Sequence, residues 1–474
     1  MKFYLCSILS LLVVFGCKNN SEKAKENYAY FGGEVINPNA RFVTLTDSEH
    51  HTDTIKLDGR NRFLYKIDNL KKGVYTFKHG GEFQTVLLEP EDSVLVRLNT
   101  LEFDESLVFT GNGAKKNNYF INEFLENEYI EKHILRLCQL EPEAFEKSID
   151  SIRNAKLKKL EPYTKKCSAS KLFKKIAKAN IDFQYYSSKE AYPFMHYGQD
   201  KGAFLKSLPN DFYSYRKDIN YNDTFFKSYH NYLRFLKHNI NTLTLEKYTS
   251  YPDYKSFNWN ILRYNLDKLE IIDSLVSNPE IKNELLYHFT MKFISFNNNQ
   301  DKTDSVVNSF LEKTTNEKAK IALTNYTKSL KNLEIGSSLP AIEVLDFNNT
   351  EHNISNLINN TPTVVSFWSH IYYNHFKKSY AKIKELKMKY PEVNFITINI
   401  DEIDVEKPKQ TFKTSKFSCS NQYVFKNPEA SKKTLAIYPM TKTIIVNKNQ
   451  KVVSANANIF SINFEEQLLG VINQ

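Results

Sequence analysis

The sequence lacks a CxxC pair, a dense block of basic residues and the high hydrophobicity of a membrane-embedded chain. None of its five cysteines forms a CxxC pair, the spacing used in dithiol chemistry. Its basic residues are interleaved with acidic ones, so ordinary surface lysines explain the formal charge of +10 without nucleic-acid binding. A mean hydropathy of -0.50 and 25% charged residues exclude a polytopic membrane protein. The length of 474 residues predicts two or three soluble domains.

The N-terminus carries a short apolar segment that is typical of a secreted protein. A lysine, an apolar run, a small residue and a cysteine follow one another in MKFYLCSILSLLVVFGCKNN. This pattern resembles the signal peptide of a bacterial lipoprotein over residues 1–16. The resemblance implies cleavage after Gly16, a lipid on Cys17 and a flexible polar tether over residues 17–27. A plain secretory signal is the alternative.

The other cysteines of the secreted chain are predicted to be free. Cys138 and Cys167 flank a predicted helix over residues 143–166, whose ends would lie about 36 Å apart at about 1.5 Å per residue. A disulfide cannot span that distance. We therefore expect Cys138 and Cys167 to be buried, free thiols.

The hydrophobic pattern divides the remaining chain into three parts. Residues 28–112 alternate apolar and polar side chains between turn signals, which predicts a small antiparallel β-sandwich. Residues 113–332 change to helical periodicity with hardly any glycine, which predicts a bundle of several helices. Residues 333–474 begin at a break around Gly336 and alternate strands with helices, which predicts an α/β domain with a mixed sheet.

Tyrosine and aliphatic side chains recur on one face of the predicted helices, for example Tyr229, Tyr232 and Leu236 together on one stretch. Helical spacing of this kind is typical of core packing. A groove that receives carbohydrate or peptide is the alternative function of this region.

Three stretches of the last part resemble one protein family. LEIGSSLPAIEVLD is similar to the opening of the thioredoxin-like domain of TlpA and ResA type thiol-disulfide oxidoreductases. NISNLINNTPTVVSFW is similar to the run into its active-site strand, and AIYPMTKTIIVNKNQKVV to its cis-proline segment and hairpin. The resemblance covers residues from about 334 to 474 and implies a C-terminal α/β thioredoxin-like fold. The N-terminal strands resemble a β-rich domain of unknown function that precedes such domains in lipoproteins.

The catalytic motif of that family is altered in this chain. Where the family has FWATWCGPC, the chain reads FWSHIYYNH, which places Tyr372 at the attacking cysteine and His375 at the resolving one. In the family, the first thiolate is stabilised by the helix dipole and the second thiol resolves the mixed disulfide. A phenol, with a reference pKa of about 10, does not replace a thiolate in that exchange. We therefore predict no catalytic residue at this degenerate site.

His370 and His375 are close enough in sequence to share a metal ion, but no third ligand is evident nearby. A helix N-terminus also disfavours an imidazolium, so His375 is expected to be neutral and hydrogen-bonded within the packing. We expect structural histidines, with no metal and no cofactor.

Two other roles remain open in this domain. The resemblance implies that Pro439 is cis and exposes the backbone before it, where an extended peptide pairs in the family. Candidates for an aromatic peptide-binding surface are therefore Trp368, Tyr372, Tyr373, Tyr438 and Pro439. A proline kept only for the fold is equally compatible. Cys419 is expected to be structural, and a one-thiol exchange or peroxidase role is its alternative.

Together these features predict a protein anchored by lipid to the cell envelope, at the outer membrane on its periplasmic or surface face. Its thioredoxin-like domain is predicted to be redox-inactive and to bind or scaffold an envelope protein or peptide, without enzymatic activity. One alternative is a divergent thiol-disulfide oxidoreductase or peroxidase that uses a cysteine such as Cys419. The other is a carbohydrate or peptide receptor in the helical region.

Overall fold

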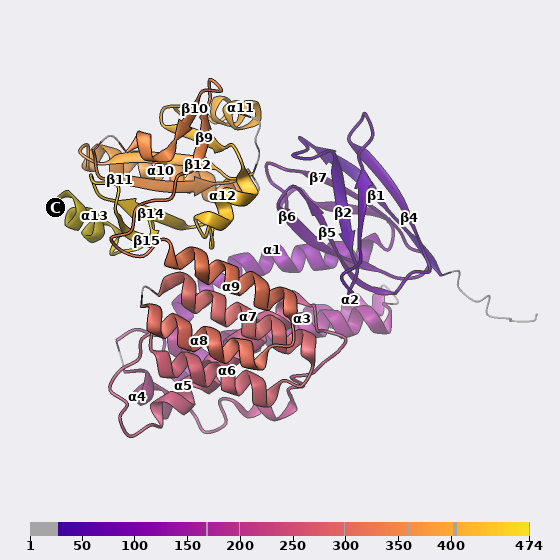
Figure 1. Cartoon of the computed structure of the whole chain (residues 1–474). Coiled ribbons are helices and arrows are strands. Elements are labelled where there is room, and N and C mark those ends of the chain that lie inside the picture. The colour runs from indigo at the N-terminus through magenta and orange to yellow at the C-terminus, as the bar shows by residue number, and fades with distance from the viewer. Residues whose placement is uncertain are drawn as a thin grey trace, which may run out of the picture.

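The computed structural model describes residues 27–166, 169–198, 200–297, 299–358, 360–370, 372–401 and 405–473. The predicted signal peptide and lipidation site Cys17 lie outside this part of the chain, as does Cys167. Within the described residues, no helix combines the length and apolar character needed to span a membrane. Strands come first along the chain, then helices, then an α/β part (Figure 1).

The N-terminal part holds two four-stranded sheets. Their strands are β1 (Tyr28–Ile36), β2 (Phe42–Thr46), β3 (Thr52–Lys56), β4 (Arg62–Asp68), β5 (Gly73–His79), β6 (Glu82–Leu88), β7 (Ser93–Asn99) and β8 (Val108–Asn112). One sheet has the order β4-β1-β7-β8 and the other the order β3-β2-β5-β6. Side chains from both sheets, among them Phe31, Phe77 and Val96, form one buried cluster, since alternate residues of a strand point to opposite faces.

One strand pair corrects the sequence prediction of an antiparallel arrangement. Strands β1 and β7 pair in parallel, with Phe31 opposite Val94 and Val35 opposite Leu98. Parallel neighbours need a long connection, and here β2 to β6 supply it. The alternation of apolar residues reveals which face of a strand is buried, but it does not reveal the direction of the neighbouring strand.

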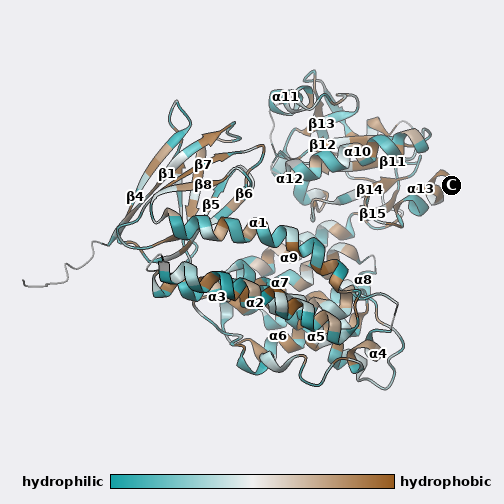
Figure 2. Cartoon of the chain, turned by 180° about the vertical axis from the view of Figure 1, so that it is seen from behind, coloured by the Kyte–Doolittle hydropathy of each residue, from teal (hydrophilic) through white to brown (hydrophobic). Residues whose placement is uncertain are grey.

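The middle part consists of helices. They are α1 (Ala114–Leu137), α2 (Pro142–Lys166), α3 (Lys171–Met195), α4 (Lys201–Lys206), the 3-10 helix η1 (Ser214–Asp218), α5 (His230–Thr249), α6 (Leu262–Leu275), α7 (Pro279–Phe296), α8 (Gln300–Lys313) and α9 (Glu317–Lys331). Gly113, with a φ of 89°, turns the chain into α1, where a Cβ would lie 2.6 Å from Asp92 Oδ1. Helices α5 to α8 supply most of one buried cluster, whereas α1 is largely hydrophilic in Figure 2.

The C-terminal part is built on one seven-stranded sheet. Its elements are β9 (Glu343–Asp346), β10 (Glu351–Asn353), η2 (Ile354–Leu357), β11 (Thr363–Trp368), α10 (Tyr373–Lys389), β12 (Asn394–Asn399), α11 (Glu406–Thr414), β13 (Gln422–Phe425), α12 (Pro428–Thr434), β14 (Lys442–Val446), β15 (Val452–Asn458) and α13 (Phe464–Ile472). The strand order is β10-β9-β13-β12-β11-β14-β15. Helix α10 joins the parallel strands β11 and β12, and the antiparallel hairpin β14–β15 precedes α13. This part of the chain therefore has a thioredoxin-like fold.

Helix α9 connects the helical part to the thioredoxin-like part. Tyr326 and Leu330 of α9 pack against the buried cluster that contains Leu435 and Ala436. Figure 1 shows α9 lying directly beneath the C-terminal sheet. The thioredoxin-like part therefore rests on the helices through an apolar contact.

Candidate functional site

Strand β11 leads the chain to the site that the resemblance identifies. All six residues of β11 are buried, because it lies between β12 and β14 in the sheet. The chain leaves the sheet after Trp368, and Tyr372 is the N-cap residue of α10. Tyr372 and His375 therefore lie at a helix N-terminus, where the helix dipole would stabilise a thiolate.

Neither of these two residues carries a thiol. Tyr372 is 51% exposed, and its side chain accepts no hydrogen bond from the first turn of α10. His375 is half-buried, and its Nε2 lies 3.3 Å from Ser379 Oγ. Desolvation, assisted by the charge of Lys378, lowers the pKa of His375, so its imidazole is neutral at neutral pH.

Trp368 is buried, so its prediction as a peptide-binding residue is corrected. Its exposed fraction is 0%, and its ring stacks on Phe376 with the centroids 4.4 Å apart. It also packs against Phe412 at 5.4 Å. Trp368 therefore supports the start of α10 from inside, and it offers no surface to a partner. The side chain of Tyr373 is not among those that the structure describes.

A carboxylate that sequence reasoning missed holds the turn between β11 and α10. Asp401, just after β12, accepts hydrogen bonds from Ser369 Oγ at 2.7 Å and from the His370 backbone N–H at 2.6 Å. Its Oδ2 also lies 3.2 Å from His370 Nδ1. Burial alone would raise the pKa of Asp401, but the hydrogen bonds from His370 and Ser369 outweigh burial and lower it. A largely buried anion therefore fixes this turn.

The two histidines of the motif are held by different partners. His370 contacts Asp401, whereas His375 contacts Ser379. The remaining nitrogens, His370 Nε2 and His375 Nδ1, have no hydrogen-bond partner within the described ranges. Those ranges also contain no group of three His, Cys, Asp or Glu residues suited to a metal ion. The two rings are thus oriented by separate neighbours, and Asn399 Nδ2 also lies 3.4 Å from His370 Nδ1.

The cis-proline segment lies beside Tyr372. The Tyr438-Pro439 peptide bond is cis, and Tyr438 is 45% exposed. Burial, the charge of Glu284 and the nearby Tyr372 together raise the pKa of the Tyr438 phenol. The carbonyl oxygen of Tyr438 accepts a hydrogen bond from Tyr326 Oη of α9 at 3.0 Å. Helix α9 therefore already occupies part of the backbone edge that the resemblance assigns to peptide pairing.

The described cysteines lie away from this site. Cys138 is fully buried, and burial raises its pKa to about 12, so this thiol is unreactive at neutral pH. Cys419 is exposed. Cys419 comes before β13, which runs parallel to β12 and hence to β11, whereas Tyr372 comes after β11. The two residues therefore lie at opposite ends of these parallel strands.

A second candidate site lies between the β-rich and helical parts. A cavity of about 750 Å³ is lined by residues of β2, β5, β6, α5 and α7 and of the loop before α5. Phe225, Phe226 and Tyr229 give it an aromatic wall, but lysine, arginine and histidine dominate its polar lining. Sequence reasoning missed these basic residues because they are interleaved with core residues along α5.

Comparison with known proteins finds similarity only to solved structures. No family model matches the chain, and no curated protein matches it. A proposed thiol-disulfide oxidoreductase from Bacteroides vulgatus matches at 17% identity and a TM-score of 0.27, over 30% of this chain and 98% of that chain. The C-terminal domain of a similarly described protein from Bacteroides thetaiotaomicron matches at 18% identity and a TM-score of 0.25, with 30% and 98% covered. A proposed thiol:disulfide interchange protein DsbE from Chlorobium tepidum matches at 14% and 0.25, with 30% and 99% covered.

Proposed function

We propose that the thioredoxin-like part of this chain binds or scaffolds a protein or peptide of the cell envelope and does not exchange disulfides. The observation that carries this proposal is the chemistry at the start of α10. Tyr372 and His375 occupy the two positions where the resembled family has cysteines. A phenol cannot attack a disulfide to form the mixed disulfide, and an imidazole cannot act as the second thiol that resolves it.

The remaining thiols do not compensate for this loss. Burial of Cys138 raises its pKa to about 12, which leaves no thiolate at neutral pH. Cys419 is accessible, which is the one observation that favours a divergent oxidoreductase or peroxidase. It lies at the opposite end of the parallel strands, which separates it from Tyr372 and from the cis-proline segment.

The surface offered to a partner is aromatic. Tyr372 and Tyr438 are both about half exposed and lie close enough for their phenols to interact electrostatically. Tyrosine contributes a large apolar face with a polar end, which suits it to protein interfaces. Tyr326 already donates a hydrogen bond to the Tyr438 carbonyl oxygen. A partner would therefore contact the side chains of Tyr372 and Tyr438, or displace Tyr326 to reach the backbone.

The proposed location follows from the N-terminus. A lipid on Cys17, followed by a polar tether, would hold the folded parts at the membrane surface. The full chain should therefore fractionate with membranes, and a Cys17→Ala variant should be released from them. Equal membrane association of both proteins would contradict the anchor.

Site-specific crosslinking tests the binding surface. A photo-crosslinking amino acid in place of Tyr372 should yield a discrete covalent adduct in cells, and Tyr438→Ala in the same chain should reduce it. Met388, which is 72% exposed near the other end of α10, is the matched control position. The same adducts from both positions, or none from Tyr372, would contradict a binding surface at this site.

A further inference from the structure

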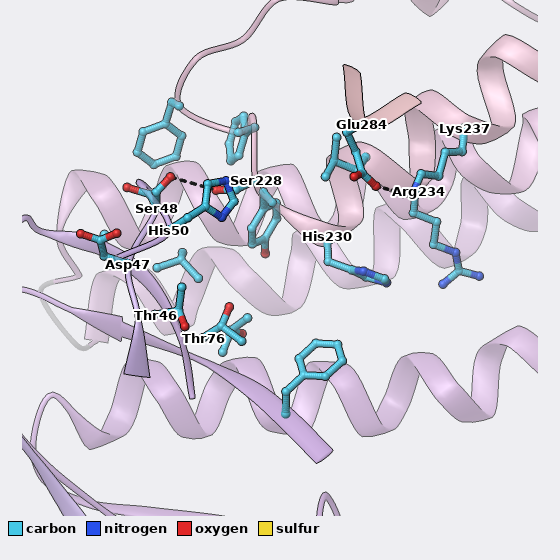
Figure 3. A pocket seen from close by; sticks show the side chains of 18 of the residues that line it. Thr46, Asp47, Ser48, His50, Thr76, Ser228, His230, Arg234, Lys237 and Glu284 are labelled. Carbon is cyan, nitrogen blue, oxygen red and sulfur yellow. Dashed lines mark hydrogen bonds and ion pairs between the residues drawn. The ribbon is translucent and has the colours of Figure 1, made fainter. Parts of the chain in front are cut away.

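The cavity between the β-rich and helical parts has walls of two kinds (Figure 3). Thr46, Asp47 and Thr76 belong to the β-rich wall, whereas His230 and Arg234 project from α5. The two walls also touch directly, since Ser228 Oγ lies 3.5 Å from the carbonyl oxygen of Ser48. The cavity therefore exists only when both parts are folded and in contact.

The helical wall carries two aligned rows of ionisable side chains. On α5, His230, Arg234 and His238 recur every four residues and lie on one face of the helix. On α7, Glu284, His288 and Lys292 have the same spacing. An ion pair of 3.1 Å between Lys237 of α5 and Glu284 of α7 links the two helices at the cavity. Core packing does not require ionisable residues at every position of such rows.

The lining has an excess of positive charge. Lys72, Lys78, Arg234, Lys237 and Lys292 face two acidic residues, Asp47 and Glu284. Glu284 forms an ion pair with Lys237, and Arg234 forms one with Glu131 of α1. In the described part of the chain, the three other lysines make no ion pair. The cavity therefore has cations available for an external anion.

Burial and the nearby cations both keep the neighbouring histidines uncharged. Desolvation, followed by the charges of Lys237 and Lys292, lowers the pKa of His288 to about 3. Desolvation and the charge of Arg234 lower that of His238 to about 4. At neutral pH both imidazoles are uncharged, so they can donate or accept hydrogen bonds without adding to the repulsion.

The size and the apolar lining define the kind of ligand. A volume of about 750 Å³ suits a small molecule, since such pockets typically measure about 300–1,000 Å³. Phe83, Phe225 and Leu233 add an apolar surface beside the cations. We propose that this cavity binds a small organic polyanion, a molecule with two or more carboxylate or phosphate groups on a compact carbon skeleton.

Calorimetric titration of the full chain tests this assignment. The probes are citrate for carboxylates, fructose 1,6-bisphosphate for phosphates, and fructose as the uncharged control. We expect one of the two anions to bind with a Kd below about 1 mM and fructose not to bind. Which anion binds identifies the acidic group. Absence of binding by both anions would overturn the proposal.

Variants with opposite expected effects locate the binding. Lys292→Gln should weaken the anion about tenfold, whereas Glu284→Gln should strengthen it severalfold, because it removes a negative charge and frees Lys237. Lys318→Gln, on the exposed side of α9 and outside the cavity, should leave the affinity unchanged. Equal weakening by Lys292→Gln and Lys318→Gln would show adventitious surface binding and overturn the assignment.

A thermal measurement guards against misfolding. Lys292 makes no ion pair within the described residues, and desolvation lowers the pKa of its ammonium group, so Lys292→Gln should melt at or above the temperature of the unaltered chain. The anion should raise the melting temperature of the unaltered chain and of Glu284→Gln, and raise that of Lys292→Gln less. An equal increase in all three would contradict binding in this cavity.

Discussion

At the scale of single residues, Tyr372 and His375 lie three positions apart at the start of α10, the same spacing as the cysteines of a CxxC motif. The helix dipole, the buried Trp368 beneath the turn and the cis bond before Pro439 are all present. What is missing is the pair of thiols. The start of α10 would therefore support disulfide exchange, but Tyr372 and His375 carry no thiol for that reaction.

Restoring both thiols should restore exchange. We expect the double variant Tyr372→Cys and His375→Cys to reduce insulin disulfides at least about tenfold faster than the unaltered chain, because a thiolate at a helix N-terminus is stabilised and the second thiol resolves the mixed disulfide. Tyr372→Cys alone is the control, since it can attack but has no resolving partner. Activity no greater in the double variant than in the single one would mean that more than the two thiols has been lost.

The hydrogen bonds of Asp401 give the second residue-level prediction. Its pKa is lowered in the folded protein, so its ionised form stabilises the fold above the unfolded pKa, and this contribution is lost as pH falls through the folded pKa. We expect Asp401→Asn to lower the free energy of unfolding by about 1–3 kcal/mol at pH 7, and by less near pH 3. Urea titration measures both values, with the exposed Asp211→Asn as control. A loss that does not change with pH would exclude the charge as its source.

At the scale of elements, a buried ion pair fastens η1 to two long helices. Arg216 of η1 donates from Nη2 and Nε to Glu190 of α3, at 2.6 and 2.9 Å. Asn239 of α5 also donates to Glu190, at 2.7 Å, and the Glu190 side chain has no exposed surface. The charge of Glu190 depends on these partners, because a buried carboxylate without them is costly.

Removal of Arg216 should therefore destabilise the fold strongly. We expect Arg216→Ala to lower the free energy of unfolding by about 3–5 kcal/mol, since it leaves Glu190 buried without its counter-ion. Arg263→Ala should cost less than about 1 kcal/mol, because its partner Asp253 is 74% exposed. Circular dichroism in urea compares the two variants. Similar losses in both would show that the buried pair contributes no more than a surface pair.

The sequence revealed most elements but not their partners. The helix predicted over residues 143–166 is close to α2, which spans Pro142–Lys166. Apolar periodicity did not reveal the parallel pairing of β1 with β7, because the side-chain period is the same in both directions. Pairing between distant segments depends on tertiary packing, which a local pattern does not contain.

The same limit applies to the candidate sites. Tyr372 and His375 were located by alignment to a motif, whereas Asp401 lies about thirty residues further on and reaches the turn only because β12 is parallel to β11. The burial of Trp368 depends on Phe412 of α11, a contact between elements far apart in sequence. The basic cavity combines residues from two parts of the chain, so no single segment indicates it.

At the scale of the whole molecule, the helices contact the cis-proline segment through Tyr326. Its hydroxyl donates to the Tyr438 carbonyl, and its ring meets the ring of Tyr438 edge to face at 6.4 Å. We expect Tyr326→Phe to speed hydrogen exchange of the amides around residues 436–442 by at least about threefold, because this contact limits local opening. Tyr423→Phe in β13 is the matched control. Unchanged exchange in Tyr326→Phe would show that the segment is held without α9.

The central claim is that this thioredoxin-like fold carries no disulfide exchange, and insulin reduction tests it most directly. The purified full chain, its Cys419→Ser variant and a competent thioredoxin would be compared in the presence of dithiothreitol. The account predicts that the full chain and the variant both match the reductant blank while thioredoxin turns over. Turnover by the full chain that disappears in Cys419→Ser would contradict it and make Cys419 the nucleophile.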